Sequence, residues 1–228
     1  MIRTDLALEA AALSGEAELP GISVCRVQKH GLELTTVTVQ NEEGARAIGK
    51  PPGRYITLET DPIGETALTG TAEAALLGES LSSLLPSEGT LLVACLGNAA
   101  ITPDALGPRS ARWVLATRHV AGREQLFRRF RPVAVLAPGV LGQTGIETAG
   151  LIRTVAREIG ASAVLAIDAL AARDAARLGR TVQIADCGIA PGAGVGNNRA
   201  ELSRQTLGVP VVSMGIPTVV DCRTLLHD

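Results

Sequence analysis

Continuous apolar runs, separated by segments with helical spacing, dominate the chain from residue 90 onward. The runs are TLLVACLG (90–97), PVAVLAPGV (132–140), SAVLAID (162–168), TVQIA (181–185) and VPVVSMGIP (209–217). Strands that are buried on both faces of a parallel sheet have this unbroken apolar character. Helical patterns over 103–120, 146–160 and 169–179 lie between them. The sequence therefore predicts an α/β fold with three layers, in which helices cover both faces of a mainly parallel central sheet.

The first third of the chain has a different pattern. Partial alternation over 21–28, 32–40 and 54–60 predicts three strands in a small N-terminal β element, for which antiparallel pairing is one alternative. Residues 66–86 then have apolar positions at helical spacing and stop at Pro86. We expect one α/β domain over 1–228, with a β-rich N-terminal part (1–60) and a βα core (90–221) that carries the site.

Composition and charge exclude several classes of function. Of the 228 residues, 46% are apolar and only 2% aromatic, so Val, Leu, Ile and Ala must build the core. A net charge of −2 argues against direct nucleic-acid binding through phosphate contacts, and the one basic run, FRRFR (127–131), fits a solvated loop or helix end. No apolar run approaches the roughly 18 to 20 residues of a membrane span.

Cysteines and glycines give no sign of a cofactor or a metal. The four cysteines stand far apart, without the spacing of a zinc site, and fit reduced thiols in the cytoplasm. The glycines of CGIAPGAGVGNNR (187–199) match neither a dinucleotide fingerprint nor a Walker loop. That stretch is either a sharp structural turn or a substrate-binding loop. We predict no cofactor.

Two aspartates follow apolar runs in similar settings. Asp104 lies in TPDALGP, and Asp168 ends the run SAVLAID. Each could cap or begin a helix, where a carboxylate suits the dipole. Alternatively, the two carboxylates meet at the carboxyl edge of the sheet, where one holds a proton and the other acts as a general base. The residues alone leave both alternatives open.

Further polar side chains follow the same predicted strands. Asn98 and Asp186 would lie at the edge that carries the two aspartates, as candidates for binding or support. Glu147, near the start of the helical pattern of 146–160, is a further candidate for binding or support, and we give helix capping more weight there than catalysis. No serine or cysteine lies in a nucleophile motif, so covalent catalysis has no support.

Several ordered motifs resemble the germination protease family of spore-forming bacteria. They are RTDLALEA, IGKPPGRYITLE, LGNAAITPDALGP, LAPGVLGQTGIET, AIDALAAR, IADCGIAPGAGVGNNR and LGVPVVSMGIPTVVD, and they span residues 3 to about 221. The resemblance implies an atypical aspartic-type endopeptidase with the fold of hydrogenase maturation endopeptidases. Its two essential aspartates fall in TPDALGP and AIDALA, which assigns those roles to Asp104 and Asp168.

The resemblance also implies substrates and setting. Such enzymes degrade small acid-soluble spore proteins in the cytoplasm of the spore core, are made as zymogens, and form homo-oligomers, a tetramer in the family. Two alternatives remain: a metal-guided maturation endopeptidase, for which we see no placed third ligand, and an inactive zymogen or remnant that binds spore proteins without cutting them.

The N-terminal motif implies a self-processing site. Family substrates are cut after the first Glu of Thr-Glu-(Phe or Ile)-Ala-Ser-Glu, and residues 4–9, TDLALE, have the same layout. We therefore expect cleavage between Asp5 and Leu6, although the stretch could also simply begin an amphipathic helix. An acidic residue before the cut needs a cation, for which position suggests Arg173 or Arg199.

Overall fold

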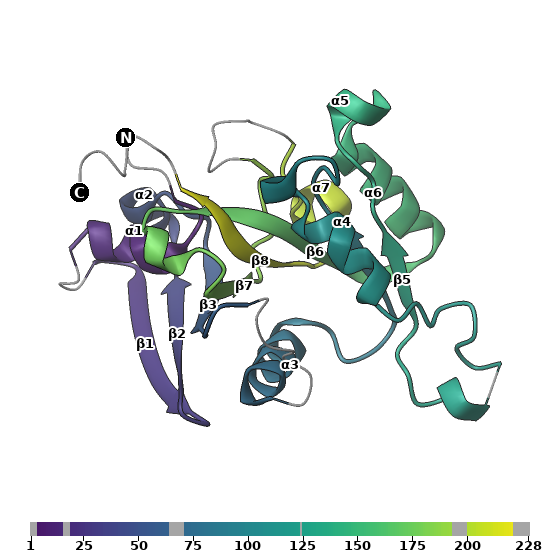
Figure 1. The fold of residues 1–228 in the computed structure, drawn as a ribbon, viewed down its shortest axis with the longest axis horizontal. Helices are drawn as coiled ribbons and strands as arrows, with labels where there is room; N and C mark the ends of the chain where they lie inside the picture. The colour runs from purple at the N-terminus through teal and green to yellow at the C-terminus, as the bar shows by residue number, and fades with distance from the viewer. Residues whose placement is uncertain (1–3, 16–18, 64–70, 124, 193–199, 221–228) are drawn as a thin grey trace.

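A single mixed sheet of eight strands runs through the described part of the chain (Figure 1). The computed structural model describes residues 4–15, 19–63, 71–123, 125–192 and 200–220. The strands are β1 (Ile22–Lys29), β2 (Leu32–Val39), β3 (Gly53–Glu59), β4 (Thr90–Cys95), β5 (Val133–Leu136), β6 (Ala161–Ala172), β7 (Thr181–Ala185) and β8 (Val211–Val220). Their order across the sheet is β1-β2-β3-β7-β8-β6-β4-β5.

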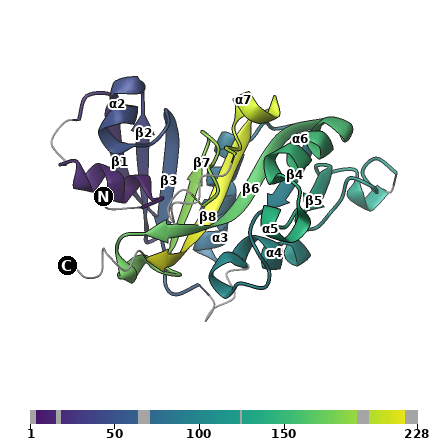
Figure 2. The same cartoon turned by 90° about the horizontal axis from the view of Figure 1, so that it is seen from above.

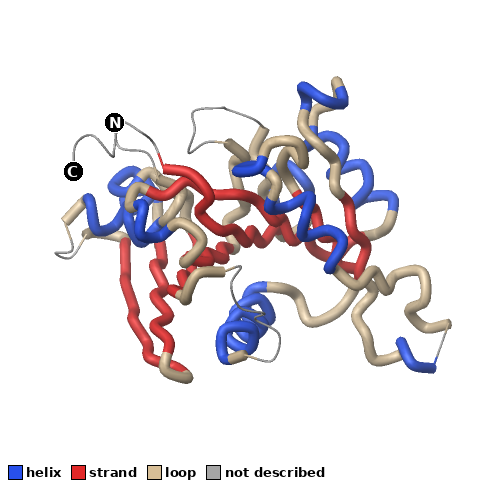
Figure 3. The backbone as a smooth tube through the Cα atoms, in the orientation of Figure 1, coloured by secondary structure: helices blue, strands red, loops and turns tan. Residues whose placement is uncertain are grey.

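The pairing divides this sheet into two parts. Strands β8, β6, β4 and β5 are parallel neighbours, as the continuous apolar runs predict. The β1, β2 and β3 pairs are antiparallel, and β3 continues antiparallel onto β7, which is antiparallel to β8 as well. The α/β class and the small N-terminal β element are therefore confirmed. Figure 3 shows the β1–β2 hairpin extending away from the rest of the fold.

Helices lie on both sides of the sheet (Figures 1 and 2). They are α1 (Ala7–Leu13), α2 (Glu42–Ile48), α3 (Ala72–Leu84), α4 (Leu106–Ser110), α5 (Leu141–Thr144), α6 (Thr148–Glu158) and α7 (Arg204–Leu207), with short 3₁₀ turns η1 (Thr102–Asp104), η2 (Ala111–Trp113), η3 (Gln125–Phe127) and η4 (Ala175–Arg177). In the part of the chain that the structure describes, no helix is both long and apolar enough to cross a bilayer.

Three of the four apolar clusters among the described residues hold these layers together. Alternate residues of the central strands face α6 and α7 on one side and α3 on the other, and both clusters consist largely of Val, Leu, Ile and Ala. A further cluster joins α1 and α2 to β2 and β3. Helices therefore bury both faces of the sheet, which gives the three layers that the sequence predicts. The expected single domain over 1–228 stays a prediction.

Two predicted helices are wrong or much shorter than expected. The strand β6 does not end at Asp168 but continues to Ala172, because Ala171 and Ala172 pair with Val219 and Val220 of β8. Only the turn η4 remains of the helix predicted over 169–179.

The helix predicted over 103–120 is reduced to η1, α4 and η2. The chain leaves the helical path because the backbone N–H groups of Thr117 and Arg118 both donate to the carbonyl oxygen of Val133, at 3.0 and 2.9 Å. These bonds hold the segment against the start of β5. In a helix the same N–H groups would instead donate to carbonyl oxygens one turn earlier.

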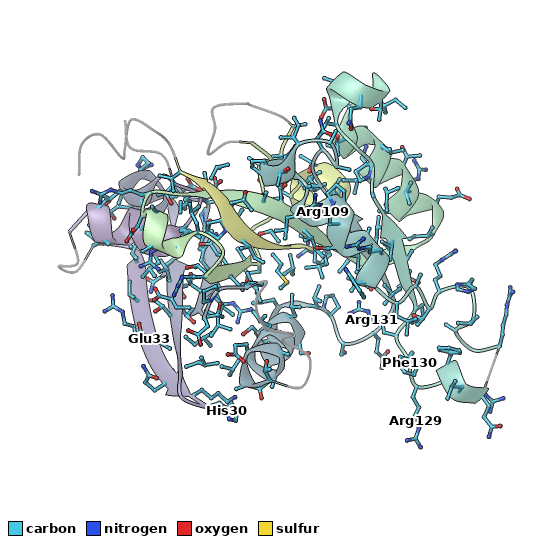
Figure 4. The ribbon with its side chains drawn as sticks, in the orientation of Figure 1. His30, Glu33, Arg109, Arg129, Phe130 and Arg131 are labelled. Carbon is cyan, nitrogen blue, oxygen red and sulfur yellow. The ribbon has the colours of Figure 1, made fainter. Side chains whose placement is uncertain are left out.

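The basic run 127–131 is only partly a solvated loop. Arg129 is exposed and points away from the fold in Figure 4, as expected. Arg131 instead donates to the carbonyl oxygens of Pro86 and Gly89, at 2.7 and 2.9 Å, and to the hydroxyl of Ser162 at 3.0 Å. Its guanidinium therefore connects the turn before β4 to the loop before β5 and to the start of β6.

Replacing Arg131 with alanine is expected to lower the free energy of unfolding by about 1–3 kcal/mol, because three strand ends lose a shared charged donor. Arg129→Ala is the matched control, and it should change stability by no more than about 0.5 kcal/mol. Urea denaturation of both variants measures the difference. Equal stabilities would show that the Arg131 bonds contribute nothing beyond solvation.

Candidate active site

Asp168 lies on β6 in the interior of the sheet. Its side chain is only 4% exposed, its strand neighbour on β8 is Gly215, and its Oδ1 accepts a hydrogen bond from the N–H of Ala169 at 2.9 Å. No helix begins at this position, so the helix-capping interpretation of Asp168 is wrong. Burying a carboxylate in the middle of a strand is costly, and a capping role does not explain that cost here.

A cavity of about 200 Å³ opens beside Asp168. Four neighbouring strands, β3, β7, β8 and β6, contribute to its wall. Asp5 and the segments that follow α2 and β7 complete the wall. The lining is Asp5, Gly49, Lys50, Pro51, Tyr55, Asp168, Ala169, Leu170, Gln183, Ala185, Cys187, Gly188, Ile189, Ala190, Gly192, Glu201, Ser213 and Gly215.

Asp104 lies at the end of η1, in the turn that follows β4. Its Oδ2 accepts from the backbone N–H of Asn98 at 2.9 Å, while the Asn98 side-chain oxygen accepts from Gln143 Nε2 at 2.6 Å. The carboxylate therefore folds back on its own turn, and the N-terminus of α4 has no side-chain cap. Asp104 does not line the cavity that Asp168 lines.

The turn that carries Asp104 is nevertheless held against the strand that carries Asp168. The N–H of Leu96 donates to the carbonyl oxygen of Ile167, the residue before Asp168, at 2.8 Å. On the other side, Thr218 of β8 donates through Oγ1 to the carbonyl oxygen of Pro103 at 2.7 Å. The turn of Asp104 and the strand of Asp168 are thus neighbours where β4 ends, whereas only Asp168 lines the cavity.

Two further candidates for binding or support, Asp186 and Glu147, do not line the cavity. Asp186 accepts from the backbone N–H and the Nε of Arg54, at 2.7 and 3.0 Å, and so joins the end of β7 to β3 outside the cavity lining. Glu147 occupies the N-cap position of α6 but makes no capping hydrogen bond, so the capping prediction is wrong. Its side chain is longer than those of Ser, Asp and Asn, which dominate helix caps.

Two arginines, Arg173 and Arg199, were predicted to bind the acidic residue of the substrate. Arg173 contributes its backbone N–H, which donates to Glu9 Oε2 at 2.7 Å, and it does not line the cavity. Arg199 lies outside the described residues. Of the glycine-rich stretch 187–199, residues 187–192 are described, and Gly188 and Gly192 line the cavity.

The N-terminal segment is seated at the edge of the cavity. The Asp5 N–H donates to the carbonyl oxygen of Ala171, and the Ala171 N–H donates to Asp5 Oδ2, both at 2.8 Å. Beyond it, Leu6 is fully buried and Glu9 accepts from the N–H groups of Arg173 and Asp174. The expected amphipathic helix is present as α1, so the segment both begins a helix and contacts β6 through Asp5.

Two cavity residues escaped the sequence analysis. Lys50 donates from Nζ to the carbonyl oxygen of Thr4 at 2.8 Å; burial lowers its pKa, and the nearby Asp5 carboxylate opposes that shift. Gln183, which is 7% exposed, donates from Nε2 to the carbonyl oxygen of Asp5 at 3.0 Å. The sequence feature that could have identified Gln183 is its position as the one amide side chain in the apolar run TVQIA.

Two more ionisable groups of the cavity remain protonated near neutral pH. Burial raises the pKa of the Cys187 thiol to about 11 and raises that of the Tyr55 phenol well above its ordinary range. A thiol with so high a pKa has little thiolate and is a poor nucleophile. Among the described residues, no three His, Cys, Asp or Glu side chains gather in an arrangement that could hold a metal ion.

Comparison with known proteins agrees with the motifs. The family model described as Germination protease matches residues 4–228. Curated relatives named germination protease are 44% identical in Caldanaerobacter subterraneus subsp. tengcongensis, 43% in Clostridium tetani and 42% in Priestia megaterium. These alignments include the whole of this chain and 72%, 73% and 65% of the respective relatives.

Proposed function

The chain belongs to the germination protease family, a family of peptidases, and we propose that it is an atypical aspartic-type endopeptidase that degrades small acid-soluble spore proteins. In this proposal Asp104 and Asp168 share the acid and base roles on a water molecule. The observation that carries it is the position of the Asp5–Leu6 peptide bond. Asp5 lines the same cavity as the buried Asp168, in a segment with the layout of a substrate.

The burial of Asp168 supports its role as one member of an acid–base pair. A carboxylate that is removed from bulk water but lines a cavity is suited to exchange a proton with a bound water molecule. Asp104 is exposed to a greater degree and is held by a backbone donor. Two such different environments allow one carboxyl group to act as the acid and the other as the base. The protons of a coupled pair nevertheless belong to the pair rather than to one residue.

We propose that the chain is made as a zymogen and cuts itself between Asp5 and Leu6. The segment before the cut lies beside β6, because the Asp5 N–H donates to the carbonyl oxygen of Ala171 and the Asp5 carboxylate accepts from the Ala171 N–H. Main-chain hydrogen bonds to a strand are a common way of binding an extended peptide, and one such bond is present here. A chain in which this segment stays bound is inactive toward other substrates, which is the form that the second alternative describes.

A peptide assay tests the proposal. The peptide Thr-Glu-Phe-Ala-Ser-Glu is incubated with the full chain, with and without a chelator, and both peptide and protein are weighed by mass spectrometry. Cleavage after the first Glu, and appearance of a chain that begins at Leu6, both unaffected by chelator, are the expected results. Inhibition by chelator would favour the metal-guided endopeptidase. An uncut peptide with an intact chain would favour the inactive form.

Lys50 is proposed as the cation that recognises the acidic residue before the cut, in place of Arg173 or Arg199. It already binds the carbonyl oxygen of Thr4 and interacts electrostatically with Asp5. The remaining proposals follow the family: action in the cytoplasm of the spore core, and assembly into a homo-oligomer, a tetramer.

Lys50→Met is expected to reduce the preference for Glu over Gln before the cut by about tenfold or more, because a hydrogen bond to a charged group is worth about 1.5–3 kcal/mol. The ratio of kcat/KM for the peptides with Glu and with Gln measures this preference. Lys29→Met is the control, since Lys29 pairs with Glu79 away from the cavity lining. An unchanged ratio in Lys50→Met would remove Lys50 from recognition.

A further inference from the structure

Gln183 contacts the two successive peptide groups that flank Leu6. Its Nε2 donates to the carbonyl oxygen of Asp5 at 3.0 Å, and its Oε1 accepts from the N–H of Ala7 at 2.8 Å. These two contacts fix the orientation of the amide. Because an N–H group of the chain faces the Oε1 end, the NH₂ end must face the Asp5 carbonyl.

The surroundings of Gln183 favour an electrostatic role. The side chain lies on β7, which is buried along its whole length, and it shares the cavity with Asp168. A donor in a site that excludes water stabilises a developing negative charge far more than the same donor in solvent. The distance of 3.0 Å is within the range in which oxyanion donors act.

We propose that Gln183 is a further catalytic residue, the donor that stabilises the oxyanion formed at the carbonyl oxygen of the residue before the cut. This inference rests on the proposed function, because it takes the Asp5–Leu6 bond as the bond that is cleaved. The segment bound in the structure then marks where the corresponding carbonyl of a protein substrate would lie.

The step balances with the aspartate pair as the only acid and base. The oxygen of a water molecule adds to the carbonyl carbon of Asp5 while its proton moves to a carboxylate, and the carbonyl oxygen becomes an oxyanion that accepts from Gln183 Nε2. When this intermediate collapses, the carbon–nitrogen bond breaks. The leaving nitrogen of Leu6 takes the proton back from the protonated carboxyl of the pair, so that one chain ends in a carboxyl group and the other begins with an amine.

The contact with Ala7 offers a competing explanation, in which Gln183 only holds the N-terminus of α1. Two variants separate the explanations. Gln183→Glu keeps the oxygen that accepts from Ala7 but, when ionised, has no donor for the Asp5 carbonyl. Gln183→Met keeps the length of the side chain and removes both hydrogen bonds.

The test measures the first-order rate of self-cleavage after Asp5 in the full chain, from pH 5 to 8, as a ratio to wild type. At pH 8 both variants should cleave about 10²- to 10³-fold more slowly, the cost of losing one oxyanion donor. For Gln183→Glu the deficit should shrink as the pH falls, because a protonated carboxyl can donate, whereas the deficit of Gln183→Met should stay constant. Hydrogen exchange at Ala7 reports in parallel whether the segment remains bound.

Wild-type rates in Gln183→Glu at pH 8, with Ala7 still protected, would overturn the inference while leaving the endopeptidase intact. A loss that appears only in Gln183→Met, together with loss of protection at Ala7, would also overturn it and assign Gln183 a holding role. If the wild-type chain does not cleave itself or the peptide at any pH, the proposed function fails and this inference fails with it.

Discussion

Replacing Asp168 with asparagine is expected to slow peptide cleavage and self-cleavage by about 10²- to 10⁴-fold, the usual contribution of a general acid or base. Asn has nearly the same shape and keeps an oxygen that can accept from Ala169, so the buried strand should remain folded. Asp104→Asn should have an effect of the same order, because its amide oxygen can still accept from Asn98 and preserve the turn. Initial rates on Thr-Glu-Phe-Ala-Ser-Glu measure both effects.

Asp61→Asn is the matched control for these two substitutions, because Asp61 is an exposed carboxylate that lies outside the cavity lining. Its rate should equal that of wild type, and thermal melting should show that all three variants are folded. Full activity in either Asp104→Asn or Asp168→Asn would contradict the acid–base pair. Loss of activity in Asp104→Asn alone would leave Asp168 without a catalytic role.

Gly107→Ala is expected to destabilise the fold by about 3 kcal/mol, the upper part of the range for overpacking a close contact. A Cβ atom at this position would lie 2.1 Å from the carbonyl oxygen of Leu96 and 2.7 Å from that of Ile167. Both are backbone atoms, which cannot rotate away as a side chain can. The start of α4 would therefore have to move away from the residue after β4 and from the middle of β6.

This movement would also separate the turn of Asp104 from the strand of Asp168. The variant should consequently lose activity even at temperatures where it is folded. Gly150→Ala in α6 is the control: nothing lies within 4 Å of its added Cβ, and replacing a helical glycine should stabilise the protein by about 0.5–1 kcal/mol. Denaturant melts with parallel rate measurements test both expectations, and equal stability of Gly107→Ala and wild type would refute the close contact.

The central strands could be predicted from the sequence because the burial of both faces leaves an unbroken apolar run. The continuation of β6 beyond Asp168 could not. Residues 169–172, Ala-Leu-Ala-Ala, favour a helix by intrinsic propensity, but pairing with Val219 and Val220 of β8 outweighs that preference. A contact across about 48 residues of chain leaves no local signal in this stretch.

The residues of the candidate site also divide into those that local sequence can predict and those that depend on distant contacts. Asp104 and Asp168 are detectable because acids that follow apolar runs are unusual and call for an explanation. Lys50 and Gln183 were missed since their importance comes from the segment that binds beside them. Arg173 was selected for its charge, whereas its described contact with Glu9 uses the backbone N–H that every residue except proline has.

The position of β8 in the sheet has a consequence for synthesis of the protein. This strand, residues 211–220, lies between β6 and β7 and is the last described strand to leave the ribosome. Until it emerges, the parallel strands and the antiparallel strands have no common partner, and the cavity lacks the wall that Ser213 and Gly215 provide. The cavity is therefore complete only after β8 has emerged and inserted between β6 and β7.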